Sequence, residues 1–268
     1  EFVDQTLTQN GQFASSFTDY LYLMIAKTPK GNQYSFIDSL NQLGNHLGSV
    51  DLGIELTGKK WDVLLYHQHP YEDKSGLVFV NFPDGLYGLC FKNKNHSLIS
   101  SFRLRQLTLE YLTTIDKGKN IREDLKNRYE ADAYFYHSQY IDGWAYKQHI
   151  IGTPFITRYL DTHFDLTNQK PNQELLMINN NEVKVVYISL MGVFKSGIRV
   201  ESRCSYSRNY GPFTNDNIKQ VNQFSGIIRS YFPLNLLKGV ELQTAISLDQ
   251  GGLYNHSWGG MLSLSKMW

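Results

Sequence analysis

Apolar and polar residues alternate along most of the chain after residue 47, and this period of two predicts β-strands. In the first such run the apolar positions are Val50, Leu52, Ile54 and Leu56, and the positions between them are Asp51, Gly53, Glu55 and Thr57. A turn at Gly58 separates this run from a second one that begins at Trp61. The two runs therefore predict a β-hairpin over residues 50–66.

The same alternation predicts further strands at 76–82, 86–93, 98–113, 183–195, 198–208, 221–232, 239–249 and 257–268. Within 98–113 the apolar positions change parity near Arg105 and Gln106, which predicts a β-bulge. Residues 1–44 lack the alternation. There the sequence predicts an irregular segment with short helices at 16–26, capped by Ser15 or Ser16, and at 34–43. The strand region is expected to cover residues 45–268, with a long outer loop at about 114–182.

The pattern of the last predicted strand is relevant to whether the chain folds in water or in a membrane. Its even positions include Leu262, Leu264 and Trp268, so one face is mostly apolar over a length typical of a strand that crosses a bilayer. Ending on an aromatic residue resembles the terminal signal of outer-membrane barrels, although Lys266 departs from that signal. A soluble sandwich alternates in the same way, and periodicity does not separate the two.

Composition narrows the classes of function. The net charge of +1 argues against a nucleic-acid binder that works by charge, and 14% aromatic residues favour a membrane interface or a sugar-binding surface. The sequence contains no apolar run long enough for a transmembrane helix. Cys90 and Cys204 lack metal-type spacing and are expected to be free thiols, with a disulfide as the alternative. No signal peptide precedes Glu1, so we expect a processed chain or a fragment.

Three motifs, in order, resemble a known family. They are Leu43-Gly-Asn-His-Leu-Gly-Ser49; the run 66–76 (YHQHPYEDKSG) followed by 81–88 (NFPDGLYG); and the run 134–146 (YFYHSQYIDGWAY) followed by Ile151-Gly-Thr-Pro154. Together they resemble the capsule-assembly Wzi family of outer-membrane proteins, especially its members from the Bacteroidetes. The resemblance covers about residues 35–268.

The resemblance implies an all-β fold, a transmembrane antiparallel β-barrel of about eighteen strands in the outer membrane of a Gram-negative cell. About ten strands can be read in the sequence, so we expect this chain to be the C-terminal portion of the barrel. The family implies non-catalytic, lectin-like binding or anchoring of surface (capsular) polysaccharide. The alternative is a structural or accessory subunit of a larger outer-membrane complex for assembly or translocation. Expected partners are polysaccharide, outer-membrane lipid and, for the second function, other outer-membrane proteins.

The sequence offers little support for chemistry. His67 and His69 share a strand face and precede Glu72 and Asp73, but no matching group of ligands recurs, so no metal site and no cofactor are predicted. A serine hydrolase would need Ser and His side by side. Neighbours such as those at 96–97, 137–138 and 256–257 point to opposite faces of a strand, so we expect no enzyme.

Sugars are held by stacking on aromatic faces and by hydrogen bonds from carboxylates and amides. The segments 66–87 and 134–146 are rich in both kinds of group: Tyr66, Tyr71, Tyr87, Tyr134, Tyr136, Tyr140 and Trp144, with Gln68, Glu72, Asp73, Asp84, Gln139 and Asp142. From these we predict a polysaccharide site made of Tyr71, Glu72, Asp73, Asp84, Tyr87, Tyr140 and Trp144. The other interpretation is an interfacial aromatic belt, favoured for Trp144 and Trp268, with acids that stabilise loops.

Overall fold

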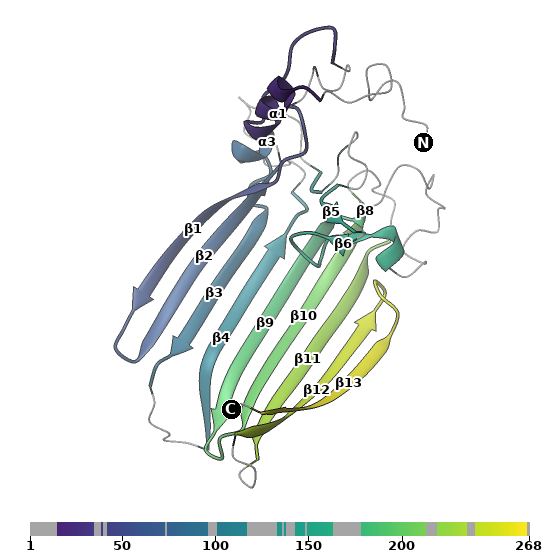
Figure 1. The fold of residues 1–268 in the computed structure, drawn as a ribbon. Helices are drawn as coiled ribbons and strands as arrows, with labels where there is room; N and C mark the ends of the chain where they lie inside the picture. The colour runs from purple at the N-terminus through teal and green to yellow at the C-terminus, as the bar shows by residue number, and fades with distance from the viewer. Residues whose placement is uncertain are drawn as a thin grey trace.

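The protein is an all-β molecule built on one antiparallel sheet. The computed structural model describes residues 15–34, 39, 42–72, 74–95, 101–116, 133–135, 137, 143–147, 149–162, 178–212, 219–234 and 239–266. Nine strands pair in the order β1-β2-β3-β4-β9-β10-β11-β12-β13. Figure 1 shows these strands side by side and slanted in one direction.

The strands of this sheet are long enough to cross a bilayer. They are β1 (Gly48–Thr57), β2 (Trp61–Tyr71), β3 (Gly85–Asn93), β4 (Phe102–Thr113), β9 (Glu182–Phe194), β10 (Arg199–Gly211), β11 (Val221–Pro233), β12 (Val240–Gly251) and β13 (Ser257–Lys266). The predicted hairpin is confirmed as β1 and β2, and the predicted bulge is confirmed by a register shift between Leu104 and Gln106 in β4.

The sheet is open. Among the described strands, β1 pairs only with β2, and β13 pairs only with β12. No helix within the described part of the chain has the length and apolar character needed to span a membrane. Cys90 and Cys204 are free and half-buried.

The smaller elements gather at one end of the sheet, which we call the loop end (Figure 1). They are α1 (Phe17–Met24), α3 (Lys74–Leu77), β5 (Ala145–Tyr146), β6 (His149–Ile150), β7 (Thr157–Arg158), the 3-10 helix η1 (Tyr159–Asp161) and β8 (Ile178–Asn180). α1 confirms the first predicted helix, and Ser16 caps it in a box with Asp19. Most of the second predicted helix lies outside the described residues.

The strand predicted at 76–82 is wrong. Residues 74–77 form α3 and residues 78–83 form turns, because Phe79 stacks on His69 of β2 and Val80 is buried, so tertiary packing overrides the strand propensity of this apolar run.

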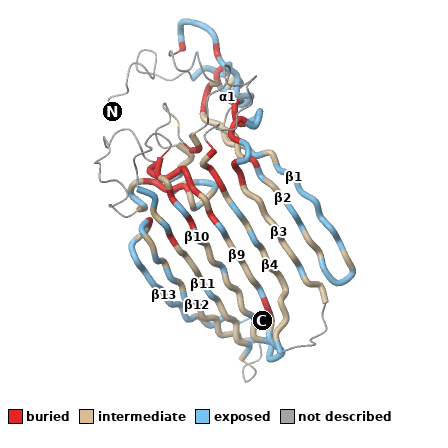
Figure 2. Tube along the Cα trace, turned by 180° about the vertical axis from the view of Figure 1, so that it is seen from behind, coloured by how far each residue is buried: buried red, intermediate tan, exposed pale blue. Residues whose placement is uncertain are grey.

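Buried residues also concentrate at the loop end (Figure 2). The apolar cluster there consists of Tyr134, Phe135, Ile156 and Ile178, with Leu47, Trp144 and Ile150 packed against it. The core of the described molecule therefore lies between the long connection from β4 to β9 and the upper part of the sheet.

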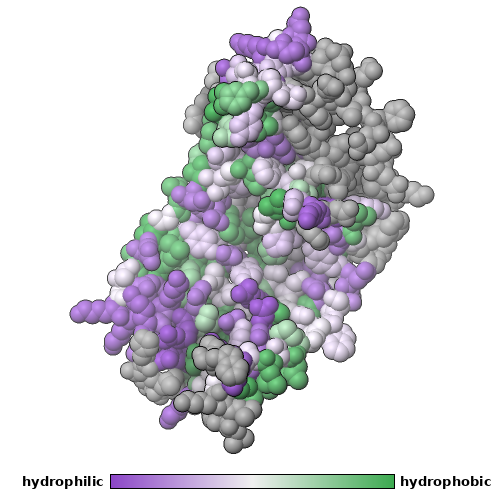
Figure 3. All heavy atoms as spheres, in the orientation of Figure 1, coloured by the Kyte–Doolittle hydropathy of each residue, from purple (hydrophilic) through white to green (hydrophobic). Residues whose placement is uncertain are grey.

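The two faces of the sheet differ in chemistry. Paired residues of an antiparallel sheet share a face. On the face that we call apolar, one complete row across the nine strands reads Ile54, Leu65, Leu89, Leu109, Ile188, Cys204, Gly226, Leu248 and Trp258. On the polar face, the adjacent row reads Gly53, Tyr66, Gly88, Glu110, Tyr187, Ser205, Ser225, Asp249 and Ser257. Figure 3 shows hydrophilic side chains gathered over the lower part of β1 to β4.

Candidate functional site

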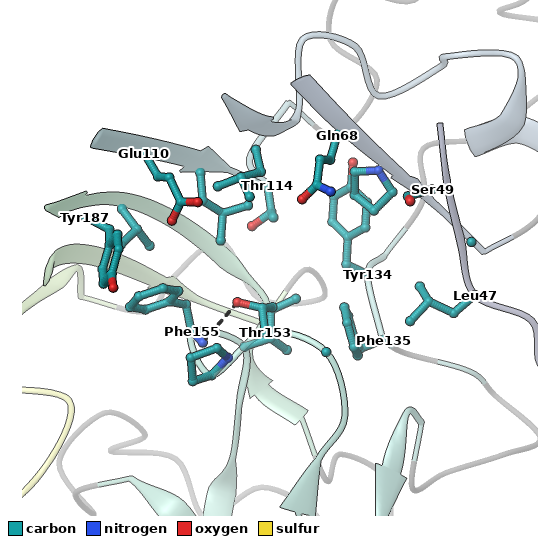
Figure 4. Close-up of a pocket in the computed structure, with 18 residues that line it drawn as sticks. Leu47, Ser49, Gln68, Glu110, Thr114, Tyr134, Phe135, Thr153, Phe155 and Tyr187 are labelled. Atoms are coloured by element: carbon teal, nitrogen blue, oxygen red, sulfur yellow. Dashed lines mark hydrogen bonds between the residues drawn. The ribbon is translucent and has the colours of Figure 1, made fainter. Parts of the chain in front are cut away.

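A cavity of about 500 Å³ lies between the polar face of the sheet and residues 134–135 and 152–156 (Figure 4). Its lining is mostly apolar and aromatic, with a few polar groups, which is the usual composition of a small-molecule site. The residues labelled in Figure 4 are Leu47, Ser49, Gln68, Glu110, Thr114, Tyr134, Phe135, Thr153, Phe155 and Tyr187.

Four strands of the sheet supply polar groups to the cavity, among them β1 with Ser49. Glu110 of β4 and Tyr187 of β9 are cross-strand partners, and Gln68 of β2 lies on the same face. Tyr66 of β2 lies in the same row of the polar face as Glu110, and its hydroxyl donates a hydrogen bond to the Glu110 carboxylate. This bond leaves the second carboxylate oxygen of Glu110 as an acceptor at the cavity.

Two buried asparagine side chains position the wall of the cavity that faces the sheet. Asn180 of β8 donates to the Phe155 carbonyl oxygen at 3.2 Å and to Asn209 Oδ1 at 3.1 Å. Both asparagines have no exposed surface, so removing either partner would leave a buried polar group unpaired. The Phe155 N–H also donates to Thr153 Oγ1 at 3.3 Å, the dashed line in Figure 4. The backbone that carries Phe155 is thereby fixed to the sheet.

Asp84 lies in the loop between β2 and β3 and forms hydrogen bonds with the long segment between β4 and β9. Its carboxylate accepts hydrogen bonds from Ile115 N and Asp116 N, both at 3.0 Å, from Thr113 Oγ1 at 3.2 Å and from the Tyr134 hydroxyl at 3.3 Å. Tyr134 lines the cavity and Asp84 does not, so Asp84 acts on the cavity by fixing the position of Tyr134.

The same carboxyl group has an unusual acidity. Burial raises the pKa of Asp84 to about 6, although the donors from Asp116, Ile115 and Thr113 act in the opposite direction. Asp84 therefore titrates near neutral pH at a position that orders two connections.

A second cavity of about 310 Å³ lies on the other side of Pro154 and Phe155. Its polar face residues include Arg203, Ser205, Ser225 and Asp249. The Tyr254 hydroxyl donates to the Pro154 carbonyl oxygen at 3.4 Å, and burial raises the pKa of Tyr254 to about 12. The polar face thus continues as a hydrogen-bonding surface beyond the first cavity.

The residues predicted as a polysaccharide site are spread around the rim of the loop end. Tyr71 ends β2 and lies against Gly48, and the Glu72 carboxylate accepts from the Phe135 N–H. Tyr87 is on the apolar face, where it stacks on His67 with ring centroids 4.2 Å apart. Trp144 packs against the apolar cluster with its indole N–H buried and without a hydrogen-bond partner among the described residues. Asp73 and Tyr140 lie outside the described residues.

None of the described members of that predicted set lines the first cavity. Gln68 and Tyr134, which belong to the wider set of sugar-binding candidates, do line it, while Tyr136, Gln139 and Asp142 are outside the described residues. Glu110, Tyr187 and Phe155 line the cavity but are not among the residues predicted from the sequence. The available signal for Glu110 was its position, a carboxylate between Leu109 and Tyr111 on the polar parity of its strand.

The described part of the chain contains no group of three or more His, Cys, Asp or Glu residues placed to hold a metal ion. His69 is buried and its two ring nitrogens lie 3.1 Å from the carbonyl oxygens of Asp84 and Gly76. In this structure His69 therefore fastens the β2–β3 connection to the sheet. Residues 96–97 and 138 of the three His-Ser pairs lie outside the described residues.

No protein-family model matches the sequence, and no curated protein matches it. Among solved structures, the chain is similar to Wzi of Escherichia coli, described as an outer membrane protein involved in group 1 capsule assembly and as a carbohydrate-binding β-barrel. The identity is 14% and the TM-score is 0.48, over 89% of this chain and 46% of that one. The chain therefore spans less than half the length of that structure.

Proposed function

We propose that this chain forms part of an outer-membrane β-barrel that binds surface (capsular) polysaccharide without chemistry, and that a sugar unit occupies the cavity at Glu110 and Tyr187. The observation that carries the proposal is the division of the sheet into an apolar and a polar face, with the cavity on the polar face at the loop end. Strands of transmembrane barrels alternate in this way, with long loops outside.

The apolar face supports a membrane environment. Its side chains are exposed to a degree that water would penalise: Leu52 is 64% exposed, Ile246 70%, Leu262 73% and Trp258 82%. An apolar area of this size needs a cover, and acyl chains provide one along its whole width. The open edges at β1 and β13 would then pair with further strands, because unpaired backbone groups are costly in lipid.

The cavity supports sugar binding. Glu110 and Gln68 supply acceptor and donor groups for hydroxyls, and Tyr187, Tyr134 and Phe155 supply aromatic faces. The second cavity continues the same chemistry, which suits a polymer longer than one unit. We further propose Tyr71 and Glu72 as rim contacts where such a polymer leaves the cavity, with Asp84 as a positioning residue.

Binding of purified capsular polysaccharide to the purified protein in detergent tests this proposal. Glu110→Gln keeps the hydrogen bond from Tyr66 but removes the charge, and it should weaken binding about tenfold, since a hydrogen bond to a charged group contributes roughly 1.5–3 kcal/mol. Tyr187→Ala should weaken binding through lost stacking.

Glu55→Gln is the matched control. Glu55 is an exposed carboxylate on the polar face of β1, outside the cavity, so this variant should bind like the wild type. Equal affinity of all three variants would place binding elsewhere, and an absence of binding by the wild type would overturn the proposal.

A further inference from the structure

The β2–β3 connection folds over the apolar face instead of extending away from the sheet. His67 and His69 project from the same face as Leu65, because residues two apart on a strand share a face. Phe79 stacks on His69 with ring centroids 4.6 Å apart, and Phe82 meets His67 edge to face at 6.3 Å. Residues 74–84, which we call the rim segment, therefore cover the loop end of the apolar face.

The rim segment exposes large apolar side chains of its own. Leu77 is 47% exposed, Phe79 41% and Phe82 51%. Phe79 adopts a φ of 63°, a left-handed conformation that costs a non-glycine residue roughly 1–2 kcal/mol. The rest of the structure maintains this unfavourable conformation, and a cost of this kind is often found where a segment has a function.

A groove of about 830 Å³ continues from the rim segment along the apolar face. It is lined by Leu65, Leu89, Leu109 and Ile188, and its upper part is formed by His67 and Tyr87, the residues that contact or adjoin Phe82. Its mostly apolar lining has the chemistry to contact a hydrocarbon chain. The His67 ring nitrogens have no hydrogen-bond partner among the described residues.

Charged side chains on the apolar face lie at its two ends. Lys184 and Arg208 are near the loop end, as their pairing with Thr113 and Asn222 shows, and Lys266 is at the opposite end. Cations in this position attract lipid phosphates, while an aromatic residue prefers the boundary between headgroups and acyl chains.

We infer that the rim segment is a membrane-interface anchor: it places Phe79 and Phe82 at the headgroup boundary of the outer leaflet, with an acyl chain of a bilayer lipid in the groove below. This inference rests on the proposed membrane location of the sheet. It adds a specific lipid contact outside the strands, on the face opposite the sugar cavity.

Tryptophan quenching by brominated lipids tests the inference in reconstituted protein. In a background where Trp61, Trp144, Trp258 and Trp268 are Phe, single tryptophans are introduced by Phe79→Trp, Ile246→Trp and Ser247→Trp. Phe79→Trp should lose more than about half of its fluorescence with lipids brominated near the headgroup and less with lipids brominated near the chain end. Ile246→Trp, on the apolar face, should show the opposite depth preference, and Ser247→Trp, on the polar face, should be quenched by neither lipid.

The controls separate the two proposals. If Ile246→Trp is quenched and Phe79→Trp is not, the anchor is overturned and the membrane location stands. If neither is quenched, both are overturned. Should the background fail to fold, photocrosslinking of the wild-type protein by a phospholipid with a diazirine near its headgroup gives the same decision: label within residues 74–84 supports the anchor, and label confined to the strands overturns it and leaves the membrane location standing.

Discussion

The two faces of the nine-stranded sheet share one backbone and one hydrogen-bond ladder, yet they differ in the side chains that they present: charged residues lie mainly on one face and large exposed apolar residues mainly on the other. At neighbouring positions of β12, Ile246 is 70% exposed on the apolar face and Ser247 lies on the polar face. A soluble sandwich would bury the apolar face against a second layer. Here the described part of the long β4–β9 connection packs on the polar face, while most of the apolar face has no second layer among the described residues.

Placing an arginine on the apolar face tests the difference between the two faces most strongly. Ile246→Arg should destabilise the protein in lipid by about 2–4 kcal/mol, because an arginine near the bilayer midplane must be taken out of water. Ser247→Arg, one residue away on the other face, should cost less than about 1 kcal/mol. The measurement is the fraction folded in liposomes across a urea series, read from the heat-dependent shift in gel mobility. Equal effects of the two variants would mean that both faces meet water.

The second prediction concerns the loop end, where Asp84 joins two connections. Its pKa of about 6 lies above the unfolded value of 3.8, so its contribution favours the fold below about pH 4 and is lost as the pH rises through 6. The full change is up to about 3 kcal/mol. Asp84→Asn does not titrate and leaves a donor opposite the Asp116 N–H. We expect the loss of stability relative to wild type to be larger at pH 4.5 than at pH 7.5, in thermal unfolding followed by circular dichroism. A pH-independent difference would contradict this.

The third prediction compares glycines on the two faces. A Cβ on Gly88 would lie 2.0 Å from the Tyr66 ring, so Gly88→Ala must move that ring and break its hydrogen bond to Glu110. We expect a loss of about 1–3 kcal/mol and weaker polysaccharide binding. On Gly260, on the apolar face, the nearest atom would be 3.9 Å away, so Gly260→Ala should be nearly neutral. Denaturant titration with a binding assay measures both effects.

Alternation along the chain predicted most of the sheet because the strands are long and each keeps one apolar face. Even the bulge in β4 could be predicted, since one extra residue moves every later side chain to the other face. The rim segment could not, because its apolar run Leu77-Val78-Phe79-Val80 is typical of a strand, whereas in the structure this segment packs on His67 and His69 of β2.

The cavity could be predicted only in part, for a physical reason. Glu110 and Tyr187 are 77 residues apart in sequence and meet because β4 pairs with β9 across the long connection. Local patterns carry no information on such a pairing. Gln68 and Tyr134 could be predicted as sugar-binding candidates because both lie in segments that are rich in aromatic and polar residues.

The smallest effect is expected at the end of the polar face away from the loops. Arg199 Nη2 contacts both carboxylate oxygens of Glu241, at 2.9 and 2.7 Å, but the arginine side chain is 50% exposed. Glu241→Gln should therefore change stability by less than about 1 kcal/mol, and the difference should shrink at high salt. The cation remains over the Tyr231 ring at 4.9 Å in the variant. A loss well above this value in urea unfolding, insensitive to salt, would mean that water is excluded from this part of the polar face. The interior would then be closed and dry at that end, and a polymer would have to reach the cavity from the loop end alone.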